Sequence, residues 1–287
     1  MKKDMKYKIG IVGVGFVGSA IAHGFAQFAD IKMYDKYNNS FHSLYEVVNE
    51  SDFIFVSVPT PMKEDGTQDL SNMDDAIESI VITAYNPKII IIKSTILPGT
   101  TKNYAYKYPG HDFVFSPEFL TERTAKIDFM NPSSIILGGI HRHSESLKLV
   151  KNLFNERFSG VNIFVTSSDA AELVKYILNS FFAVKISFFN EIYDMTQYMG
   201  IDYDEIKAMV LSDFRIADSH CDVPGHDGDR GYGGKCFPKD VNALVSWAES
   251  QNLHADIAKI SSLVNERLRD SKDWLNIKGA TSLNNYH

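Results

Sequence analysis

The first 35 residues contain the feature that most restricts how this chain can fold. An apolar run, Tyr7–Val12, leads directly into the glycine-rich segment Gly13–Gly18, and small residues follow through Ala26. A second apolar run ends at Asp35, 22 residues after Gly13. A strand, a glycine turn, a helix and a second strand with an acid at its end form the fingerprint of a dinucleotide-binding βαβ unit.

In such a unit the glycines allow a tight turn and a close approach of the pyrophosphate, and the acid reaches the ribose hydroxyls. The residues assigned to the cofactor here are Gly13, Gly15, Phe16, Val17, Gly18, Asp35 and Lys36. Nicotinamide and flavin dinucleotides both use this turn. The carboxylate of Asp35 would repel a 2′-phosphate, so NAD is expected rather than NADP. Lys36 would attract that phosphate, which leaves NADP as the alternative.

Composition and length describe an ordinary globular protein of one large or two medium domains. The chain has 287 residues, of which 44% are hydrophobic and 23% charged. Its net charge of −7 argues against a nucleic-acid partner. The two cysteines give no disulfide framework and fit a reducing cytoplasm. No signal peptide is expected before the first strand, no segment is long enough to span a membrane, and no metal site is expected.

Strand-like and helix-like segments alternate over the first 168 residues. Further strands are expected at Phe53–Val58, Ile89–Lys93, Phe113–Phe115, Ser134–Leu137 and Asn162–Val165, with helices such as Asp74–Tyr85 and Ser144–Arg157 between them. This alternation predicts an α/β fold with a Rossmann-type, doubly wound parallel sheet. Residues 1–168 are therefore expected to form an NAD-binding domain, and residues 169–287 a helical central domain.

The second domain is expected to begin with a long spine helix. Asp169–Met199 contains no proline or glycine and predicts one helix of roughly 31 residues, about 46 Å long. Its apolar side chains point in all directions, so it is expected to be buried on every side, between domains or between subunits. We expect a homodimer packed along this helix, with Phe182 facing the partner. Shorter helices are expected at Tyr203–Leu211, Lys239–Gln251 and Ala255–Leu275.

A long glycine- and aspartate-rich loop, residues 213–235, leads to Cys236. A proline two residues later suits the first turn of a helix, so Cys236 is expected at a helix N-terminus, where the helix dipole favours a thiolate. Asp240 follows one turn later on the same face. A thiolate behind a glycine turn indicates a covalent intermediate, and a small buried cysteine before a helix is the simpler alternative.

Several other polar residues lie where a substrate could bind. Lys175 and Asn179 are four residues apart on the long helix and share a face, where an ammonium and an amide could stabilise an oxyanion. Thr95, Glu118 and Glu122 follow predicted strands, at the sheet edge where open α/β folds bind ligands. Taken singly, each of these residues could equally be a helix cap or a solvated surface group.

Another predicted strand ends in Val58, Pro59 and Thr60, which would stiffen the rim of the cofactor site. An ordinary loop is an equally good interpretation of this segment.

Taken together, these motifs resemble those of the UDP-glucose/GDP-mannose dehydrogenase family, whose members oxidise the alcohol of a sugar nucleotide to a carboxylate with NAD. The motifs occur in the family's order over about the first 250 residues. They are the glycine turn, Val58-Pro59-Thr60-Pro61, Lys93-Ser94-Thr95, Ser116-Pro117-Glu118-Phe119-Leu120, Ala171-Glu172-Leu173-Val174-Lys175 with Asn179, Arg215-Ile216, and the block from Gly231 to Asp240.

The resemblance implies two hydride transfers and one thiol. Cys236 would add to the aldehyde formed first, and oxidation of the thiohemiacetal would give a thioester that water releases as the acid. Lys175 and Asn179 would hold the oxyanion, and Asp240 would orient Lys175 or the attacking water. Thr95, with contacts to both cofactor and water, would act with Glu118 and Glu122 to position water and supply the base.

The resemblance also implies a set of substrate contacts. They are Glu118, Phe119, Leu120, Lys175, Asn179, Arg215, Tyr232, Gly233 and Gly234. In this family the arginine often reaches the site of the partner subunit. UDP-glucose is the expected substrate, with GDP-mannose and a UDP-N-acetylhexosamine as alternatives.

Two departures from the family pattern bear on the substrate site. The segment between Pro224 and Gly231 is longer than the family's commonest form, and only 47 residues follow Asp240, too few for the usual nucleotide-gripping C-terminal domain. A cofactor-binding or dimer-forming remnant without a substrate site is therefore the non-enzyme alternative. A β-hydroxyacid dehydrogenase would share the two-domain plan and the lysine–asparagine pair, but it has no use for Cys236.

Overall fold

The computed structural model describes residues 7–282, which divide by their contacts into two compact units. The first unit holds residues 7–60 and 70–175, and the second holds residues 61–69 and 176–282. The N-terminal residues Met1–Asp4, on which the expected absence of a signal peptide rests, lie outside the described residues. The proposed domain boundary at residue 168 stays a prediction.

The first unit is built on a seven-stranded sheet. Its strands are β1 (Tyr7–Val12), β2 (Ala29–Tyr34), β3 (Phe53–Val56), β4 (Ile89–Ile92), β5 (Asp112–Phe115), β6 (Ser134–Gly139) and β7 (Asn162–Ser167). They lie in the order β2-β1-β3-β4-β5-β6-β7, and every neighbouring pair is parallel except β5 and β6. The predicted α/β doubly wound sheet is confirmed. The antiparallel pair differs from the prediction, because the chain after β5 re-enters the sheet at the edge where β5 ends.

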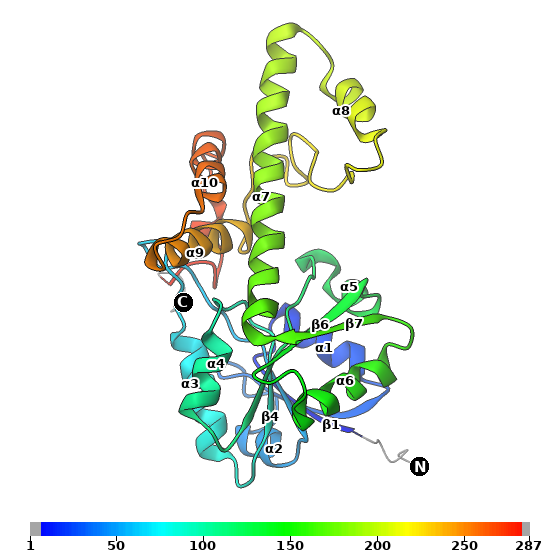
Figure 1. The fold of residues 1–287 in the computed structure, drawn as a ribbon, viewed down its shortest axis with the longest axis vertical. Helices are drawn as coiled ribbons and strands as arrows, with labels where there is room; N and C mark the ends of the chain where they lie inside the picture. Colours follow the sequence, from blue (N-terminus) through cyan, green and yellow to red (C-terminus); the bar gives the residue numbers. More distant parts are fainter. Residues whose placement is uncertain (1–6, 283–287) are drawn as a thin grey trace. The chain divides into compact units, whose positions relative to one another are not determined.

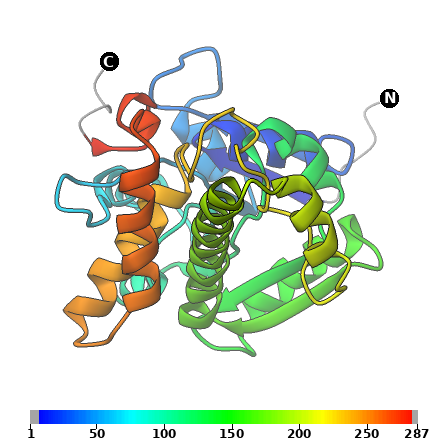
Figure 2. The same ribbon diagram turned by 90° about the horizontal axis from the view of Figure 1, so that it is seen from above.

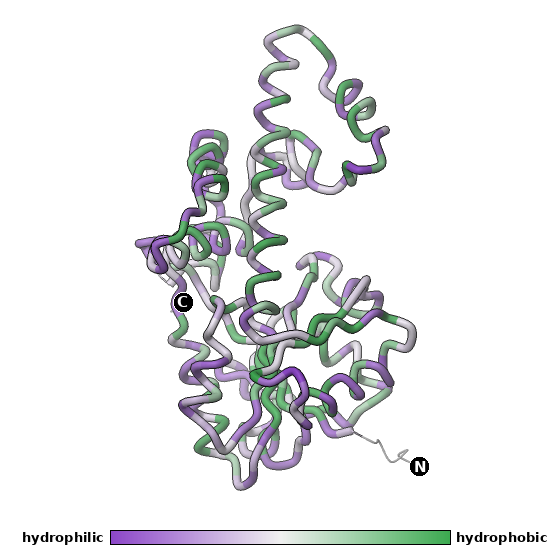
Figure 3. Tube along the Cα trace, viewed as in Figure 1, coloured by the Kyte–Doolittle hydropathy of each residue, from purple (hydrophilic) through white to green (hydrophobic). Residues whose placement is uncertain are grey.

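Helices cover both faces of this sheet (Figure 1). One face carries α1 (Phe16–Phe25), α5 (Ala125–Met130) and α6 (Glu145–Arg157), and the other carries α2 (Leu44–Asn49), α3 (Ser71–Thr83) and α4 (Thr100–Lys107). Because both faces are covered, strands β3 and β4 read as unbroken apolar runs. Figure 3 shows the apolar residues concentrated along the strands.

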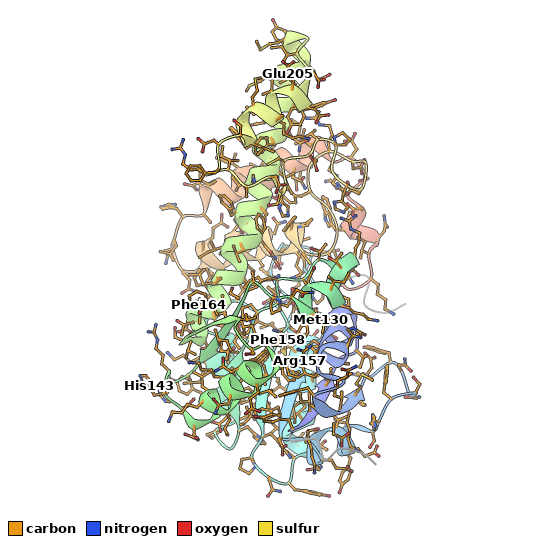
Figure 4. The ribbon with its side chains drawn as sticks, turned by 90° about the vertical axis from the view of Figure 1, so that its right-hand side faces the viewer. Met130, His143, Arg157, Phe158, Phe164 and Glu205 are labelled. Atoms are coloured by element: carbon orange, nitrogen blue, oxygen red, sulfur yellow. The ribbon has the colours of Figure 1, made fainter. Side chains whose placement is uncertain are left out.

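An arginine at the end of α6 contacts both α1 and α5 on the same face of the sheet. The Arg157 Nε donates to the carbonyl oxygen of Gly24 in α1 at 2.5 Å, and its guanidinium lies 4.6 Å from the ring centre of Phe158. The same side chain contacts the sulfur of Met130 at the end of α5, so these three labelled residues lie side by side in Figure 4. Such contacts hold α1, and with it the glycine turn, against the rest of the unit.

The second unit is helical. It comprises most of α7 (Ser168–Met199) with α8 (Tyr203–Leu211), α9 (Phe237–Ser250), α10 (Asp256–Leu268) and the short 3₁₀ helix η2 (Asp273–Asn276). Seen along α7 in Figure 2, α9 and α10 lie on one side of it and α8 on the other. A small core joins each side to α7, one around Tyr232 and Val241 and the other around Phe189 and Tyr203.

One helix prediction was wrong. The expected helix Ala255–Leu275 ends at Leu268, because Arg269 leaves the helical conformation with φ of −117° and ψ of 86°. Its side chain turns instead to Asp227 and Asp273, which the sequence pattern of a helix cannot reveal.

The long helix α7 is confirmed, and within the single chain one of its faces is exposed; its burial by a partner stays a prediction. Ile177, Phe181 and Phe188 are 51%, 59% and 56% exposed and share one face, whereas Phe189 is buried. Phe182 stacks on His220 of its own chain, with ring centres 4.1 Å apart, and is half-buried; that it faces a partner stays a prediction. None of the helices within residues 7–282 has the length and apolar character to cross a membrane.

Candidate active site

The glycine turn after β1 has the geometry that a dinucleotide requires. Gly13 has φ of 89°, and a Cβ there would lie 2.6 Å from the carbonyl oxygen of Ser57. A Cβ on Gly18 would lie 2.1 Å from the carbonyl oxygen of Gly13, so only glycine lets α1 pack against the turn. At Gly15, the N-cap of α1, a Cβ would meet nothing within 4 Å. That open space before a helix N-terminus fits a pyrophosphate.

The acid of this unit lies directly beside the turn. The carboxylate of Asp35 accepts the N–H of Val14 at 2.9 Å and the N–H of Tyr37 at 3.0 Å. The ammonium of Lys36 lies 2.9 Å from the carboxylate of Asp75, and this hydrogen bond raises the pKa of Lys36. Because Asp75 already neutralises Lys36, the surroundings of Asp35 favour the free ribose hydroxyls of NAD over a 2′-phosphate.

The other residues assigned to the cofactor lie at the carboxyl ends of neighbouring strands or in the first turn of α1. They are Phe16, Val17, Val58, Pro59, Thr60 and Thr95. The hydroxyl of Thr60 donates to the carbonyl oxygen of Thr95 at 2.8 Å, and the hydroxyl of Ser94 donates to the carbonyl oxygen of Val58 at 2.7 Å. These bonds tie the segments after β3 and β4 into one rim at the edge where such sheets bind ligands.

A buried ion pair joins two of the candidate catalytic residues. The ammonium of Lys175 lies 2.9 Å from the carboxylate of Glu118, and both side chains are almost fully buried. Burial disfavours the charged carboxylate, but attraction to Lys175 and hydrogen bonds from Lys175 and the Leu120 N–H outweigh it, so the pKa of Glu118 is lowered. Glu118 is thus an ionised partner that holds Lys175 in place.

A second buried lysine lies beside this pair, and the sequence reasoning did not assign it a role. Lys93 follows β4 and donates to the hydroxyl of Ser116 at 3.1 Å and to the carbonyl oxygen of Pro117 at 3.0 Å. Burial lowers the pKa of Lys93 to about 7, with Glu118 raising it and Lys175 lowering it further. The signal in the sequence was a lysine that directly follows a run of four isoleucines, the last three of them buried.

Glu172, one turn before Lys175 on α7, was also missed. Its carboxylate accepts the N–H of Gly99 at 2.7 Å and the N–H of Thr101 at 2.8 Å, and so caps α4 in place of a side chain from α4 itself. Burial raises the pKa of Glu172 to about 7 despite these hydrogen bonds. Through these hydrogen bonds Glu172 attaches the loop that contains Thr95 to the first turns of α7.

A cavity of about 230 Å³ opens in the first unit beside these groups. Lys93, Glu118, Phe119 and Leu120 line it, together with aromatic residues of α5 and α6. The ammonium of Lys175 lies 5.8 Å from the ring centre of Phe119. The structure therefore places the predicted substrate contacts Glu118, Phe119 and Leu120 around a space that a small polar group could enter.

The second unit brings together a different pair. The amide of Asn179 donates to the carboxylate of Asp240 at 2.6 Å, and Asp240 also forms an ion pair with Lys239. All three side chains are buried. Asp240 thus orients Asn179, whereas Lys175 is held by Glu118. Lys175 and Asn179 remain on one side of α7, since four residues make about one turn.

Cys236 is the N-cap residue of α9, as the sequence predicted. Pro238 lies in the first turn of the helix, and the N–H of Asp240 donates to the carbonyl oxygen of Cys236 at 2.9 Å. The thiol-bearing residue is half-buried, while the other cysteine, Cys221, is fully buried. A half-buried cysteine at a helix N-terminus suits a nucleophile.

The glycine turn before Cys236 is held mainly by side chains of its own unit. Tyr232 is buried, and burial raises its pKa to about 12. The N–H of Gly234 donates to the carboxylate of Asp273 at 2.8 Å, and a Cβ on Gly233 would lie 2.3 Å from the guanidinium of Arg269. The expected substrate contacts in this turn therefore have a packing role that the sequence did not show.

Two further candidates are on the surface. The Arg215 guanidinium pairs with Asp213, with its Nε at 2.9 Å from one carboxylate oxygen, and the side chain is 77% exposed. Glu122 begins the 3₁₀ helix η1 (Glu122–Thr124) and is exposed. Within residues 7–282, no group of three or more His, Cys, Asp and Glu side chains is arranged to hold a metal ion.

Comparison with known proteins connects these features to one family. Residues 31–158 match the NAD-binding domain of the UDP-glucose/GDP-mannose dehydrogenase family, and residues 169–267 match its central domain. The chain is 33% identical over 247 residues to UDP-glucose 6-dehydrogenase of Rickettsia prowazekii, an alignment that covers 84% of this chain and 53% of that protein. The chain thus spans about half the length of the curated relatives it matches.

Solved structures show the same fold. A UDP-glucose dehydrogenase from Pyrobaculum islandicum superposes with a TM-score of 0.82 at 27% identity, covering 93% of this chain and 69% of that one. The 3-hydroxyisobutyrate dehydrogenase of Mycobacterium tuberculosis gives a TM-score of 0.73 at 15% identity, with 92% and 94% of the two chains covered. At 15% identity the second likeness concerns the fold alone.

Proposed function

Because the chain belongs to the UDP-glucose/GDP-mannose dehydrogenase family, we propose that it oxidises the 6-hydroxyl of a sugar nucleotide to a carboxylate, with two NAD reduced per turnover. UDP-glucose is the first choice of substrate, since the relatives that resemble the chain in sequence are named UDP-glucose 6-dehydrogenases. GDP-mannose and UDP-N-acetylhexosamines are the alternatives.

The observation that carries this proposal is Cys236 as the N-cap of α9. A dehydrogenase that transfers a single hydride needs no nucleophile, whereas oxidation of an aldehyde to an acid is readily achieved through a thioester. The hydrogen bond between Asn179 and Asp240 lies one helical turn further along α9. A thiol with an oriented amide in the same unit suits an intermediate whose oxygen becomes negatively charged.

The proposed cofactor fits the residues after β1 and β2. Gly13, Gly15 and Gly18 leave room for a pyrophosphate at the N-terminus of α1, and Asp35 offers a carboxylate to the ribose. NAD supplies the acceptor for each of the two hydrides. The rim formed by Thr60 and Thr95 would close the neighbouring edge of this site.

In the first half of the reaction the alcohol loses a hydride and a proton and becomes an aldehyde. Cys236 gives its thiol proton to solvent and adds as a thiolate to the aldehyde carbon, which forms a C–S bond and moves the C=O electron pair onto oxygen. The resulting oxyanion takes up a proton to give the thiohemiacetal. We propose that the Lys175 ammonium and the Asn179 amide stabilise this oxyanion. Glu118 and Asp240 fix the two groups in position.

In the second half the thiohemiacetal loses a hydride and a proton and becomes a thioester. Water attacks the carbonyl carbon, the C–S bond breaks, and the carboxylate leaves with Cys236 restored as a thiol. We propose that Thr95, Glu118 and Glu122 position this water and accept its proton. Arg215, exposed on its loop, would bind a sugar nucleotide in the partner subunit.

The deciding experiment is the stoichiometry of complete turnover with UDP-glucose. We expect two NADH for each carboxylate, and the Cys236→Ser variant should yield at most one, because a hydroxyl is a far weaker nucleophile than a thiol of pKa about 8.5. One NADH per product with release of an aldehyde by the unmodified protein would contradict the thioester mechanism, as would unchanged turnover of Cys236→Ser.

A panel of sugar nucleotides separates the remaining candidates. GDP-mannose and UDP-N-acetylmannosamine belong in it, because dehydrogenases named for these substrates share the fold at TM-scores of 0.67 and 0.78. A preference for one of these would change the substrate and keep the mechanism. Binding of NAD without oxidation of any panel member would favour a cofactor-binding remnant.

A further inference from the structure

The turn that delivers Cys236 is gripped from two sides by residues outside the set assigned to catalysis. From α7, the amide oxygen of Asn190 accepts the Nε–H of Arg230 at 3.1 Å and the N–H of Gly231 at 3.3 Å. From α10, the amide of Asn265 accepts the N–H of Tyr232 at 2.7 Å and donates to its carbonyl oxygen at 2.9 Å. The two asparagines therefore hold the side chain of Arg230 and the backbone of Gly231 and Tyr232.

Arg269, four residues after Asn265, holds the next part of the turn. Its guanidinium is 3% exposed and donates through Nε to Asp273 at 2.7 Å and through Nη2 to Asp227 at 2.6 Å. The other carboxylate oxygen of Asp273 accepts the N–H of Gly234 at 2.8 Å. A chain of hydrogen bonds thus runs from Asp227 through Arg269 and Asp273 to the backbone two residues before Cys236.

These contacts explain why the turn contains glycine at positions 231 and 233. A Cβ at Gly233 would lie 2.3 Å from Nη2 of Arg269 and 2.3 Å from the carboxylate of Asp273. A Cβ at Gly231 would lie 2.3 Å from the amide oxygen of Asn265. All three distances are far below van der Waals contact, so only glycine at these positions lets the turn pack against Arg269, Asp273 and Asn265.

The acid at one end of the network lies in the loop between Pro224 and Gly231. Asp227 and Asp229 fall between Pro224 and Gly231, and the carboxylate of Asp229 accepts the hydroxyl of Ser271 at 2.9 Å. These loop residues thus fold back onto the segment after α10. They supply Arg269 with Asp227 and, at 3.9 Å, with Asp229, in addition to Asp273.

We propose that Arg269 is a positioning residue for Cys236, which it acts on through Asp273 and Gly234, and that the long loop serves to hold Arg269 in place through Asp227. This inference rests on the proposed thioester function for its catalytic meaning. Arg269 touches no reacting atom. It fixes the turn so that Cys236 stays at the N-terminus of α9.

The charges support a tightly held network. Burial disfavours the charged guanidinium, but the hydrogen bonds that it donates to Asp273 and Asp227 outweigh this and raise the pKa of Arg269. Burial likewise opposes the charge of Asp227, but the hydrogen bonds that it accepts from Arg269 and from the N–H of Asp229 outweigh burial, so the pKa of Asp227 is lowered. The planar fork of arginine serves two carboxylates at once, which the single ammonium of lysine cannot do in the same geometry.

The test compares Arg269→Lys and Asp227→Asn with the matched variant Arg267→Lys. Arg267 lies two residues earlier, in the last turn of α10, is 66% exposed and reaches Glu191 only at 3.5 Å. The first readout is alkylation of Cys236 by iodoacetamide, followed by mass spectrometry of the Cys236 peptide. We expect about a tenfold slower reaction in Arg269→Lys and a smaller loss in Asp227→Asn, because the thiolate loses its place at the helix N-terminus. Arg267→Lys should match the parent chain.

The second readout separates positioning from folding. NADH formation is measured from the sugar-nucleotide alcohol and, separately, from the aldehyde. Arg269→Lys should slow the aldehyde reaction about tenfold and release aldehyde during turnover of the alcohol, while the first oxidation changes less than about threefold.

Unchanged alkylation in a folded Arg269→Lys variant would overturn the proposal, and so would equal losses in both oxidations. If Arg269→Lys fails to fold, Asp227→Asn decides by the same two readouts, since it keeps the pair of Arg269 with Asp273. Absence of sugar-nucleotide oxidation by the parent chain would refute the proposed function instead, and the alkylation rates would still test the role of Arg269.

Discussion

At the scale of single residues, the first unit contains two buried carboxylates whose charges meet different surroundings. Burial disfavours ionisation of both Glu118 and Glu172. Glu118 faces the full positive charge of Lys175 at 2.9 Å, and its pKa falls below the ordinary value. Glu172 meets the N–H groups of Gly99 and Thr101, whose partial charges do not offset burial, and its pKa rises to about 7.

This difference predicts opposite effects of pH on stability. Between pH 4.5 and about 7 the unfolded chain has ionised Glu172 while the folded chain keeps it protonated, so its contribution to stability falls as pH rises. Glu172→Gln removes this trend. Relative to the parent chain, the variant should gain on the order of 2–3 kcal/mol between pH 4.5 and 7 in urea unfolding.

Glu118→Gln is the matched control for that measurement. The lowered pKa of Glu118 means that its stabilising contribution is present above about pH 4.5 and is lost as the pH falls through the lower folded-state value. The variant should therefore be least stable, relative to the parent chain, at neutral pH. The same pH trend in both variants would contradict our account of the two carboxylates.

The choice of cofactor is also decided by single residues. Asp35→Ala should weaken NAD binding and narrow the preference over NADP, because it removes the carboxylate beside the glycine turn. Asp75→Asn should raise the use of NADP severalfold with little effect on NAD, since it frees Lys36 from its ion pair. Both effects are measured by comparing kcat/KM for NAD and for NADP between each variant and the parent chain. Equal use of the two cofactors by the parent chain would show that Lys36 dominates.

At the scale of elements, the turn from Gly231 to Gly234 combines two reasons for glycine. Gly233 has an ordinary backbone conformation but no room for a Cβ, whereas Gly234 has room and a φ of 72°. Gly233→Ala should destabilise the second unit by about 1–3 kcal/mol through the clash with Arg269 and Asp273. Gly234→Ala should cost about 1 kcal/mol through backbone strain.

A double substitution distinguishes the two causes by thermal unfolding. Replacing Arg269 by alanine should remove much of the added cost of Gly233→Ala and leave that of Gly234→Ala unchanged. Gly110→Ala, where a Cβ would meet nothing within 4 Å and φ is negative, should be close to neutral. If the losses of unfolding free energy from Gly233→Ala and Arg269→Ala were additive, the need for glycine at position 233 would not come from its contact with Arg269.

The fold could be predicted where a local pattern decides the structure. Four isoleucines define β4, and the absence of proline and glycine defines α7, so both were predicted to within a residue. The antiparallel pairing of β5 with β6 depends on how residues 116–133 return to the sheet, which no local period records. The end of α10 was missed because Arg269 turns toward Asp227, a partner distant in sequence.

In the candidate site, too, the sequence predicted the features set by local pattern and not those set by tertiary contacts. The position of Cys236 at the N-terminus of α9 followed from Pro238 and the glycines. The partners of the two oxyanion candidates did not follow, because Glu118 approaches Lys175, and Asp240 approaches Asn179, only through tertiary folding. Their catalytic roles stay predictions.

At the scale of the whole molecule, one face of α7 is left without a covering surface among residues 7–282. Ile177, Phe181 and Phe188 form an apolar stripe on that face, and burying each such side chain is worth about 1.5–3 kcal/mol. The exposed loop that carries Arg215 belongs to the same unit. Both features favour a partner copy of this chain over a lone subunit.

We therefore expect a two-fold dimer packed along α7, in which Arg215 serves the partner's substrate site. Phe181→Glu combined with Phe188→Glu should yield monomers in multi-angle light scattering and abolish sugar-nucleotide oxidation together, because a buried unpaired carboxylate is costly at such an interface. Ile82→Glu, at a residue of α3 that is 77% exposed, introduces the same charge elsewhere and should leave both properties intact. A stable monomer of the unmodified chain that still oxidises its substrate would refute both the dimer and the shared role of Arg215.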